Sequence, residues 1–332
     1  MLSRVAENLY WLSRYLERAE NVARLLDIGM FLELDAADIS VNDGSAPVEI
    51  ALSILSCGEA YRSSKRPARS NGRGISAEQS ERDNLLRFLT FDRANPQSIL
   101  SMVAHARENA KGTQETLGVD IWSEINRLYL YLSGRRAQER FVSSPYRFYT
   151  KITRSCVLVE GMIVQSLPRD EVYHFLQVGL HLERAEVIGR ILFAKCMSLN
   201  NPQQSWEASI QLVRWASLLR SCSAYAAYLR TESDRIDPEG VVRFLVLNPD
   251  FPRSIRYCVA RCRDSLQEIS GGDDDDYGDA CQAERLLGRL DSDLRYIGVE
   301  EIFERGLLSF LGEIEQTCSR VGREVQQSYF CT

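Results

Sequence analysis

The residues best suited to chemistry in this sequence are acidic and basic side chains that occur in two copies of one motif. Leu-Glu-Arg-Ala-Glu occupies residues 16–20 and recurs 166 residues later at residues 182–186, with an arginine four residues beyond each copy. A carboxylate can act as a general base and a guanidinium group binds carboxylates and phosphates, so one interpretation is amide-bond chemistry on an anionic substrate. The candidate catalytic residues are Glu17, Arg18, Glu20 and Arg24.

The spacing of the motif also allows a structural role. Glu20 and Arg24 stand one helical turn apart, as do Glu186 and Arg190, so each pair can form within its own helix. Such pairs contribute about 0.3 to 0.5 kcal/mol when exposed, whereas a buried network would fix how the two copies dock. The alternative is a shared polar pocket, in which the arginines bind an anion and the glutamates orient an amine.

The two motif helices differ on one face. At the positions where the first helix has Glu, Trp, Arg and Asn, the second has Tyr, Gln, Leu and Val. This difference predicts that a contact surface for a partner or substrate, with an outward-facing tryptophan, lies on the N-terminal helix; a merely solvated face is the alternative. The candidate binding residues are Glu7, Trp11, Arg14, Asn21, Glu183, Arg184, Glu186 and Arg190.

A second repeated motif follows the first in the same order. Arg-Phe-Leu at residues 87–89 and Pro-x-Ser-Ile at residues 96–99 recur at residues 243–245 and 252–255. Because the two motifs are collinear in both halves, they predict a duplicated helical unit, with copies at approximately residues 1–140 and 165–332.

The prolines of the second motif predict helix starts. Asn95 and Pro96 have the residue types of an N-cap and a first helical residue, and Pro252 takes the same place in the second copy. Ser98 and Ser254 would then lie in the first turn, where free backbone N–H groups favour an anion. Both serines are therefore candidate anion-binding residues, although local capping of the helix explains the same residues and is the favoured interpretation.

Helical periodicity extends along most of the chain. Apolar residues at steps of three and four predict a long helix over residues 2–26, and further helices are expected over residues 50–61, 121–132 and 146–166. Pro168 and the Asp237–Pro238 pair are expected to start helices. We find no alternation typical of strands, so the predicted fold is all-α, a multi-helix bundle of two duplicated halves with a pseudo-twofold relation, forming a single domain over residues 1–332.

Composition excludes several classes of protein. The chain of 332 residues is 45% hydrophobic, which suits a globular protein, and has no apolar run near the roughly 18 residues of a membrane helix. The N-terminus lacks the pattern of a signal peptide, so we expect a cytoplasmic protein without membrane association. A net charge of −6 argues against nucleic acid as a partner, and the basic residues 62–73 are interpreted as a solvated loop.

Metal and cofactor sites are not predicted. Nine cysteines without a Cys-x-x-Cys spacing suit buried thiols in a reducing compartment, and Cys258 and Cys262, one turn apart, lack further ligands. The acidic residues 273–276 are interpreted as an extended loop rather than a magnesium site. No glycine-rich phosphate loop is present, so no cofactor is expected.

Several short segments stand out in combination. They are Glu17–Glu20, Asn95–Ile99 with Arg107, Leu167–Glu171, Phe175, Gly179, Glu183–Glu186 and Phe251–Ile255. Together they resemble the bacterial alpha-E domain family. The resemblance implies an all-helical protein, encoded or fused beside circularly permuted ATP-grasp ligases, with transglutaminase-like peptidases as other neighbours, and it implies no known reaction. Tyr173 and Val187 depart from the tryptophan and the polar residue usual in the family, which weakens the case for a site in the second copy.

Three hypotheses for function follow. The first is a helical component of an ATP-grasp-linked system for peptide or amide ligation, or for peptide modification, that binds the ligase or its amino-acid or peptide substrate through a Glu/Arg pocket. The second is an enzyme that itself catalyses amide-bond chemistry, and the third is a structural scaffold. The sequence gives neither the substrate nor the oligomeric state.

Overall fold

The fold is helical throughout the part of the chain that the structure describes. The computed structural model describes residues 1–38, 52–64, 77–199, 208–232, 235–271 and 281–331, and these ranges contain no strand, which confirms the all-α prediction. The helices are α1 (Ser3–Asp38), α3 (Gly58–Ser64), α4 (Ala77–Phe91), α5 (Ile99–Gly112), α6 (Gln114–Leu117), α7 (Val119–Ser133), α8 (Arg135–Ser143), α9 (Pro145–Ser166), α10 (Glu171–Leu199), α11 (Ala208–Ser221), α12 (Tyr225–Thr231), α13 (Pro238–Val242), the π-helical turn η1 (Arg243–Leu247), α14 (Ile255–Ser270), α15 (Gln282–Tyr296), α16 (Val299–Arg305) and α17 (Leu307–Tyr329).

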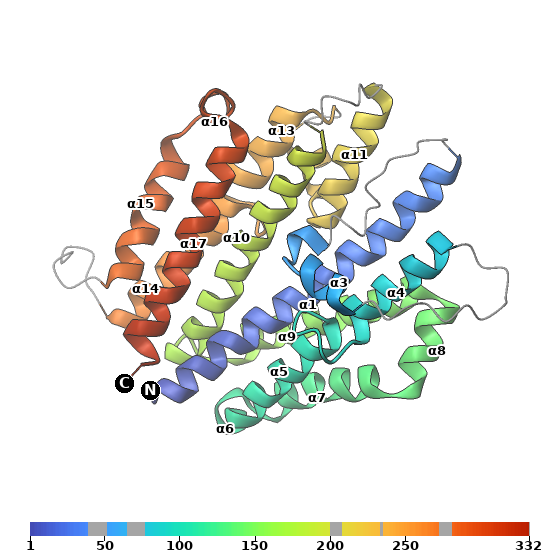
Figure 1. The fold of residues 1–332 in the computed structure, drawn as a ribbon. Helices are drawn as coiled ribbons and strands as arrows, with labels where there is room; N and C mark the ends of the chain where they lie inside the picture. The colour runs from blue at the N-terminus through green and yellow to red at the C-terminus, as the bar shows by residue number, and fades with distance from the viewer. Residues whose placement is uncertain (39–51, 65–76, 200–207, 233–234, 272–280, 332) are drawn as a thin grey trace.

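Helix α1 crosses the middle of the molecule and separates two groups of helices (Figure 1). Its predicted apolar stripe is buried from Leu9 to Leu26, whereas Leu2, at the start of the stripe, is 77% exposed. The opposite face of α1 packs along α10, so both faces of the helix are covered. A helix covered on both faces must bury its polar side chains as well, and this requirement shapes the site described below.

The two groups of helices pack in the same pattern. In the first, α1 contacts α5 and α9, α5 contacts α7, and α7 and α8 both contact α9. In the second, α10 contacts α14 and α17, α14 contacts α15, and α15 and α16 both contact α17. Each group encloses its own apolar core. This correspondence is what a duplication requires, and the duplication with its pseudo-twofold relation stays a prediction.

Helices α1 and α10 approach closely where they cross. A Cβ atom on Gly179 would lie 2.2 Å from the carbonyl oxygen of Tyr10, so no larger residue fits there. The hydroxyl of Ser13 on α1 donates a hydrogen bond of 2.7 Å to the carbonyl oxygen of Leu176 on α10, so Ser13 links the two helices where they cross. The close contact brings the two Leu-Glu-Arg-Ala-Glu segments face to face.

Two predicted helix starts were wrong by a few residues. The helices begin at Ile99 and Ile255, with Ser98 and Ser254 as N-caps, and not at the preceding prolines. Each proline lies in a turn closed by a backbone hydrogen bond from the serine N–H to the carbonyl oxygen three residues earlier. A proline presets φ for the second position of such a turn as well as for a first helical residue, so the residue type alone does not distinguish the two.

Other boundaries also differ from the prediction. The helix expected over residues 50–61 is interrupted at Ser56, whose φ is +52°, and α3 starts only at Gly58. Helix α10 begins at Glu171 rather than Pro168, with the Asp170 carboxylate accepting hydrogen bonds from the next turn.

Other predicted elements are present or lie outside the described residues. The helices over residues 121–132 and 146–166 are present as α7 and α9, and the predicted start at Asp237 is confirmed. Most of the predicted basic loop and the acidic residues 273–276 lie outside the described ranges. Within those ranges, none of the helices is both long and apolar enough to pass through a lipid bilayer.

Candidate functional site

The two copies of the motif bind each other reciprocally. The guanidinium group of Arg184 on α10 donates to both carboxylate oxygens of Glu17 on α1, at 3.1 and 2.8 Å. The guanidinium group of Arg18 on α1 donates to both oxygens of Glu183 on α10, at 2.6 and 2.7 Å. Each motif thus supplies the acid for the arginine of the other, and both contacts are bidentate, the strongest form of this interaction.

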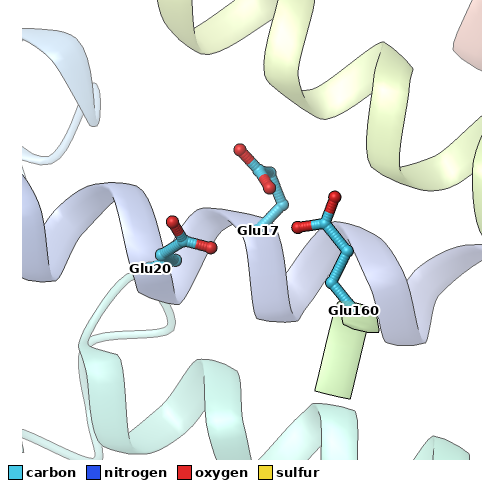
Figure 2. Close-up of side chains that lie close together, drawn as sticks. All are labelled: Glu17, Glu20 and Glu160. Atoms are coloured by element: carbon cyan, nitrogen blue, oxygen red, sulfur yellow. The ribbon is translucent and has the colours of Figure 1, made fainter. Parts of the chain in front are cut away.

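Around Glu17 lies what we call the N-terminal cluster. Arg253, from the turn before α14, donates to Glu17 at 2.8 Å and to Glu20 at 2.7 Å, while Arg24 binds Glu20 from the next turn of α1. Figure 2 shows that Glu160 on α9 directs its carboxylate toward Glu17. The Glu160 carboxylate also binds the guanidinium group of Arg184 at 3.1 Å. The cluster consists of Glu17, Glu20, Glu160, Arg24, Arg184 and Arg253.

Around Glu183 lies the C-terminal cluster, which has the same composition. Arg14 on α1 donates to Glu183 at 2.8 Å and to Glu186 at 2.7 Å. Arg190 binds Glu186 from the next turn of α10 and reaches Glu315 on α17, both at 3.0 Å. The cluster consists of Glu183, Glu186, Glu315, Arg14, Arg18 and Arg190. Each cluster holds three acids and three arginines, so its formal charge is balanced.

The acids of each cluster have divergent pKa values. Glu17 and Glu183 are completely buried, yet their arginine partners outweigh burial and hold the pKa of Glu17 well below its usual range and that of Glu183 at about 2. For Glu20 and Glu186, burial and the charge of the neighbouring glutamate outweigh the arginines and raise the pKa. We call Glu17 and Glu183 the inner acids and Glu20 and Glu186 the outer acids. A pair of acids with separated pKa values is a familiar arrangement for acid–base catalysis, although structural ion networks produce it as well.

The space beside the inner acid Glu17 is small. The cavity that touches Glu17, Glu20 and Glu160 has a volume of about 20 Å³ and is otherwise lined mainly by apolar side chains. A cavity of this size holds about one water molecule. It is too small for an amino acid or a peptide, which favours the structural role for Glu17.

A metal ion does not fit the N-terminal cluster either. Oxygen atoms of Glu17, Glu20 and Glu160 lie within 4.8 Å of one another, which is close enough to share a cation. The same three carboxylates already accept hydrogen bonds from three arginines. A divalent ion would add two positive charges to a balanced cluster and would have to displace these donors, so the donor set favours arginine over metal.

Comparison with known proteins places the sequence in a family. Residues 1–330 match the model of a family described as a predicted alpha-helical domain with a conserved ER motif. The chain belongs to the Alpha-E family. Over 328 residues it is 22% identical to uncharacterised proteins from two strains of Mycobacterium tuberculosis and from Mycobacterium bovis. The match covers 94% of this chain and 34% of each relative, so the chain spans about a third of their length. No solved structure matches it.

The polar face predicted on the first helix of this Alpha-E domain is not solvated. Arg14 and Asn21 are buried, and Asn21 links Glu17 to Arg253. Trp11 is only partly exposed and lies beside the Arg14 guanidinium, 5.4 Å from ring centroid to Cζ. The expected outward-facing tryptophan is therefore wrong, because Trp11 packs against the apolar core of the second group and against Tyr10 and Tyr15 of its own helix. The contact surface itself stays a prediction. Glu7 is exposed and belongs to neither cluster.

Ser98 and Ser254 serve the Alpha-E fold as helix caps. Both are completely buried, and the hydroxyl oxygen of each accepts a hydrogen bond from the backbone N–H three residues later. The Ser98 hydroxyl in turn donates to Ser101, and that of Ser254 donates to the carbonyl oxygen of Asn248. The structure thus assigns the capping alternative to both serines.

Three members of the clusters were not among the predicted site residues. Arg253 lies in the repeated Pro-x-Ser-Ile motif, which marked the segment but gave no indication of its partners. Glu160 and Glu315 each come from the last long helix of one group, and no sequence pattern distinguished them. Cys258 and Cys262 are buried free thiols whose pKa is raised by burial, in agreement with a packing role.

Proposed function

We propose that this Alpha-E domain is a helical component of an ATP-grasp-linked system for peptide or amide ligation, which binds the ligase and does not itself catalyse the reaction. In this proposal the two clusters brace the two groups of helices against each other. The supporting observations are that every glutamate and arginine of the two motifs binds another member of the clusters, and that the cavity beside Glu17 has space for about one water molecule.

A bracing role follows from the chemistry of buried ion pairs. Removing one partner of such a pair leaves a buried charge without compensation, which costs about 3 to 5 kcal/mol. Reciprocal pairs across the contact between α1 and α10 therefore disfavour any other register of these helices. A substrate could reach the inner acids only if the two helices separated.

The link to an ATP-grasp ligase, and to a transglutaminase-like protein as a second partner, rests on the family resemblance. The length of the relatives is compatible with it, because in those proteins the matching region is one part of a chain about three times as long. A domain of this kind would work beside other domains, either within one chain or as a separate subunit.

The test combines the purified protein with a circularly permuted ATP-grasp ligase from the same organism, ATP, Mg²⁺ and a mixed amino-acid pool, followed by mass spectrometry. We expect a new amide product, or its faster formation, when both proteins are present, together with a complex on size-exclusion chromatography. Glu304→Gln on α16 is the matched control for the Glu20→Gln variant described below, because Glu304 is exposed and lies outside the clusters. A ligase that forms the same product at the same rate alone, without binding this protein, would contradict the proposal.

A second candidate function is catalysis by the outer acids. The raised pKa of Glu20, beside the depressed pKa of Glu17, favours this alternative. In that case Glu20→Gln would keep the fold and the complex with the ligase but abolish product formation. If this variant supports product formation like the unmodified protein, the bracing role is favoured.

A further inference from the structure

A groove opens between α1 and α9, beside the N-terminal cluster, and Arg24 of that cluster lines it. Its volume is about 700 Å³, within the range of protein binding sites. Ile28 on α1 and Val157, Leu158 and Met162 on α9 give it an apolar lining, and Val157 and Leu158 are each 45% exposed. Gly161 also lines the groove, and a Cβ atom there would meet nothing within 4 Å. The groove thus has apolar walls and a point of close approach on one side of α9.

The first half of α9, which lines the groove, and the preceding helix α8 are strongly basic. Residues 135–154, which form α8 and the first half of α9, contain six basic residues against one glutamate, in a chain whose net charge is −6. All six basic side chains are exposed. Arg154 itself lines the groove, and Arg24 lines it from α1. The basic residues of this surface are Arg135, Arg136, Arg140, Arg147, Lys151 and Arg154.

We propose that this groove binds an acidic amphipathic helix of a partner protein, with the apolar face of that helix against Val157, Leu158 and Met162 and its acidic residues facing the arginines of α8 and α9. The lining residues of α9 recur from Tyr146 to Gln165 at steps of three and four, which is the spacing that a second helix packs against. The span corresponds to about 30 Å of helix.

The lining favours a protein segment over the other polyanions. Tyr146 is the one aromatic residue along the groove, whereas single-stranded nucleic acid is bound through several stacking rings.

The inference deepens the proposed function. It rests on that proposal because it takes the occupant of the groove to be a partner protein. Its test selects binders from a displayed library of helical peptides about 20 residues long. Selection uses the full chain as the target. Peptides that also bind the variant Gly161→Leu, whose leucine side chain fills the groove, are removed from the library. Leucine also favours the helix more than glycine does, so the variant keeps α9. Gly312→Leu on α17 is the matched control, because a Cβ atom at Gly312 also meets nothing within 4 Å.

We expect the selected peptides to carry net negative charge and apolar residues at helical spacing. Measured by fluorescence anisotropy, their affinity should fall about tenfold or more in Gly161→Leu and in Arg147→Glu/Arg154→Glu. It should stay unchanged in Gly312→Leu and in the charge-reversed control Arg320→Glu/Arg323→Glu, whose arginines are exposed on α17.

Three results would overturn the inference: no binder that depends on the groove, binders that are neutral or basic, or binding only to single-stranded oligonucleotides or anionic vesicles offered in parallel. The ligase experiment separates this failure from a failure of the proposed function. If the ligase binds Gly161→Leu and unmodified protein equally, the partnership stands and the groove is not its surface. If the ligase binds neither, the partnership fails whatever the peptides show.

Discussion

The N-terminal and C-terminal clusters both neutralise an inner and an outer acid with arginines, but these arginines come from different parts of the chain. In both, the inner acid is held by one arginine of the opposite motif and by a second arginine that it shares with the outer acid. The shared arginine of the N-terminal cluster is Arg253, from a turn 236 residues away. That of the C-terminal cluster is Arg14, from the opposite motif helix itself. The requirement is therefore two guanidinium groups for each inner acid, and the source of the second one is free to vary.

The counterparts of the two shared arginines support this interpretation. At the offset of the motifs, Arg14 corresponds to Leu180, and in the Pro-x-Ser-Ile repeat Arg253 corresponds to Gln97. At each of these two corresponding positions, one half of the chain thus has an arginine and the other half does not. If the halves arose by duplication, each kept one of two equivalent solutions.

The largest expected effect is the loss of a shared arginine. Arg253→Met and Arg14→Met should each lower the free energy of unfolding by about 3 to 5 kcal/mol, because each leaves two adjacent buried carboxylates with one guanidinium group fewer. The effects should be similar if the clusters are equivalent. Urea denaturation measures both, and a loss confined to one variant would show that only one cluster braces the fold.

The next effect separates inner from outer acids. At pH 7, Glu17→Gln and Glu183→Gln should each cost about 3 kcal/mol, and Glu20→Gln and Glu186→Gln about 1 kcal/mol, because burial already disfavours the charge of the outer acids. Denaturant unfolding of the four variants gives the comparison.

The pH dependence of the inner-acid effect has a defined sign. The folded-state pKa of Glu183 is depressed to about 2, so its contribution is complete above the unfolded value near 4.5 and is lost as the pH falls toward 2. The deficit of Glu183→Gln should shrink over that window. A deficit that persists at pH 2 would mean that packing, and not charge, is responsible.

A compensating exchange tests the equivalence more finely. Leu180 lines the same small cavity as Glu17 and Glu20, so an arginine at position 180 should reach the acids that Arg253 binds. We expect the double variant Arg253→Gln/Leu180→Arg to have a free energy of unfolding about 1 to 2 kcal/mol higher than the two single effects added together would give. Thermodynamic additivity would mean that the two positions are not interchangeable.

The smallest effect lies at the edge of the N-terminal cluster. Burial raises the pKa of Asp27 to about 6, so its ionised form destabilises the fold; the penalty is absent below pH 4 and complete above about pH 6. Asp27→Asn should therefore stabilise the protein at pH 7 by up to about 1 kcal/mol, allowing for solvent screening of a half-buried group. Thermal unfolding at pH 7 and pH 4 should show the gain only at the higher pH.

The sequence predicted local features better than distant contacts. Helix periodicity placed α7 and α9, and one-turn spacing predicted the pairs Glu20–Arg24 and Glu186–Arg190, which form as expected. The reciprocal pairs of the inner acids depend on the crossing of α1 and α10, and spacing along one helix cannot give that geometry. Arg253 reaches Glu17 because α14 packs against α10, and no pattern along one helix predicts that contact. Trp11 likewise packs against the core of the second group, which the periodicity of α1 does not reveal.

A double-mutant cycle on Glu17 and Arg184, followed by urea denaturation, tests the bracing role most directly. If the reciprocal pairs lock the two groups of helices together, Glu17→Gln and Arg184→Met should each cost about 3 to 5 kcal/mol, and the double variant should lose at least about 2 kcal/mol less than their sum. If both single variants keep the full stability of the protein while product formation with the ligase is lost, the motifs form a functional site and the bracing role is contradicted.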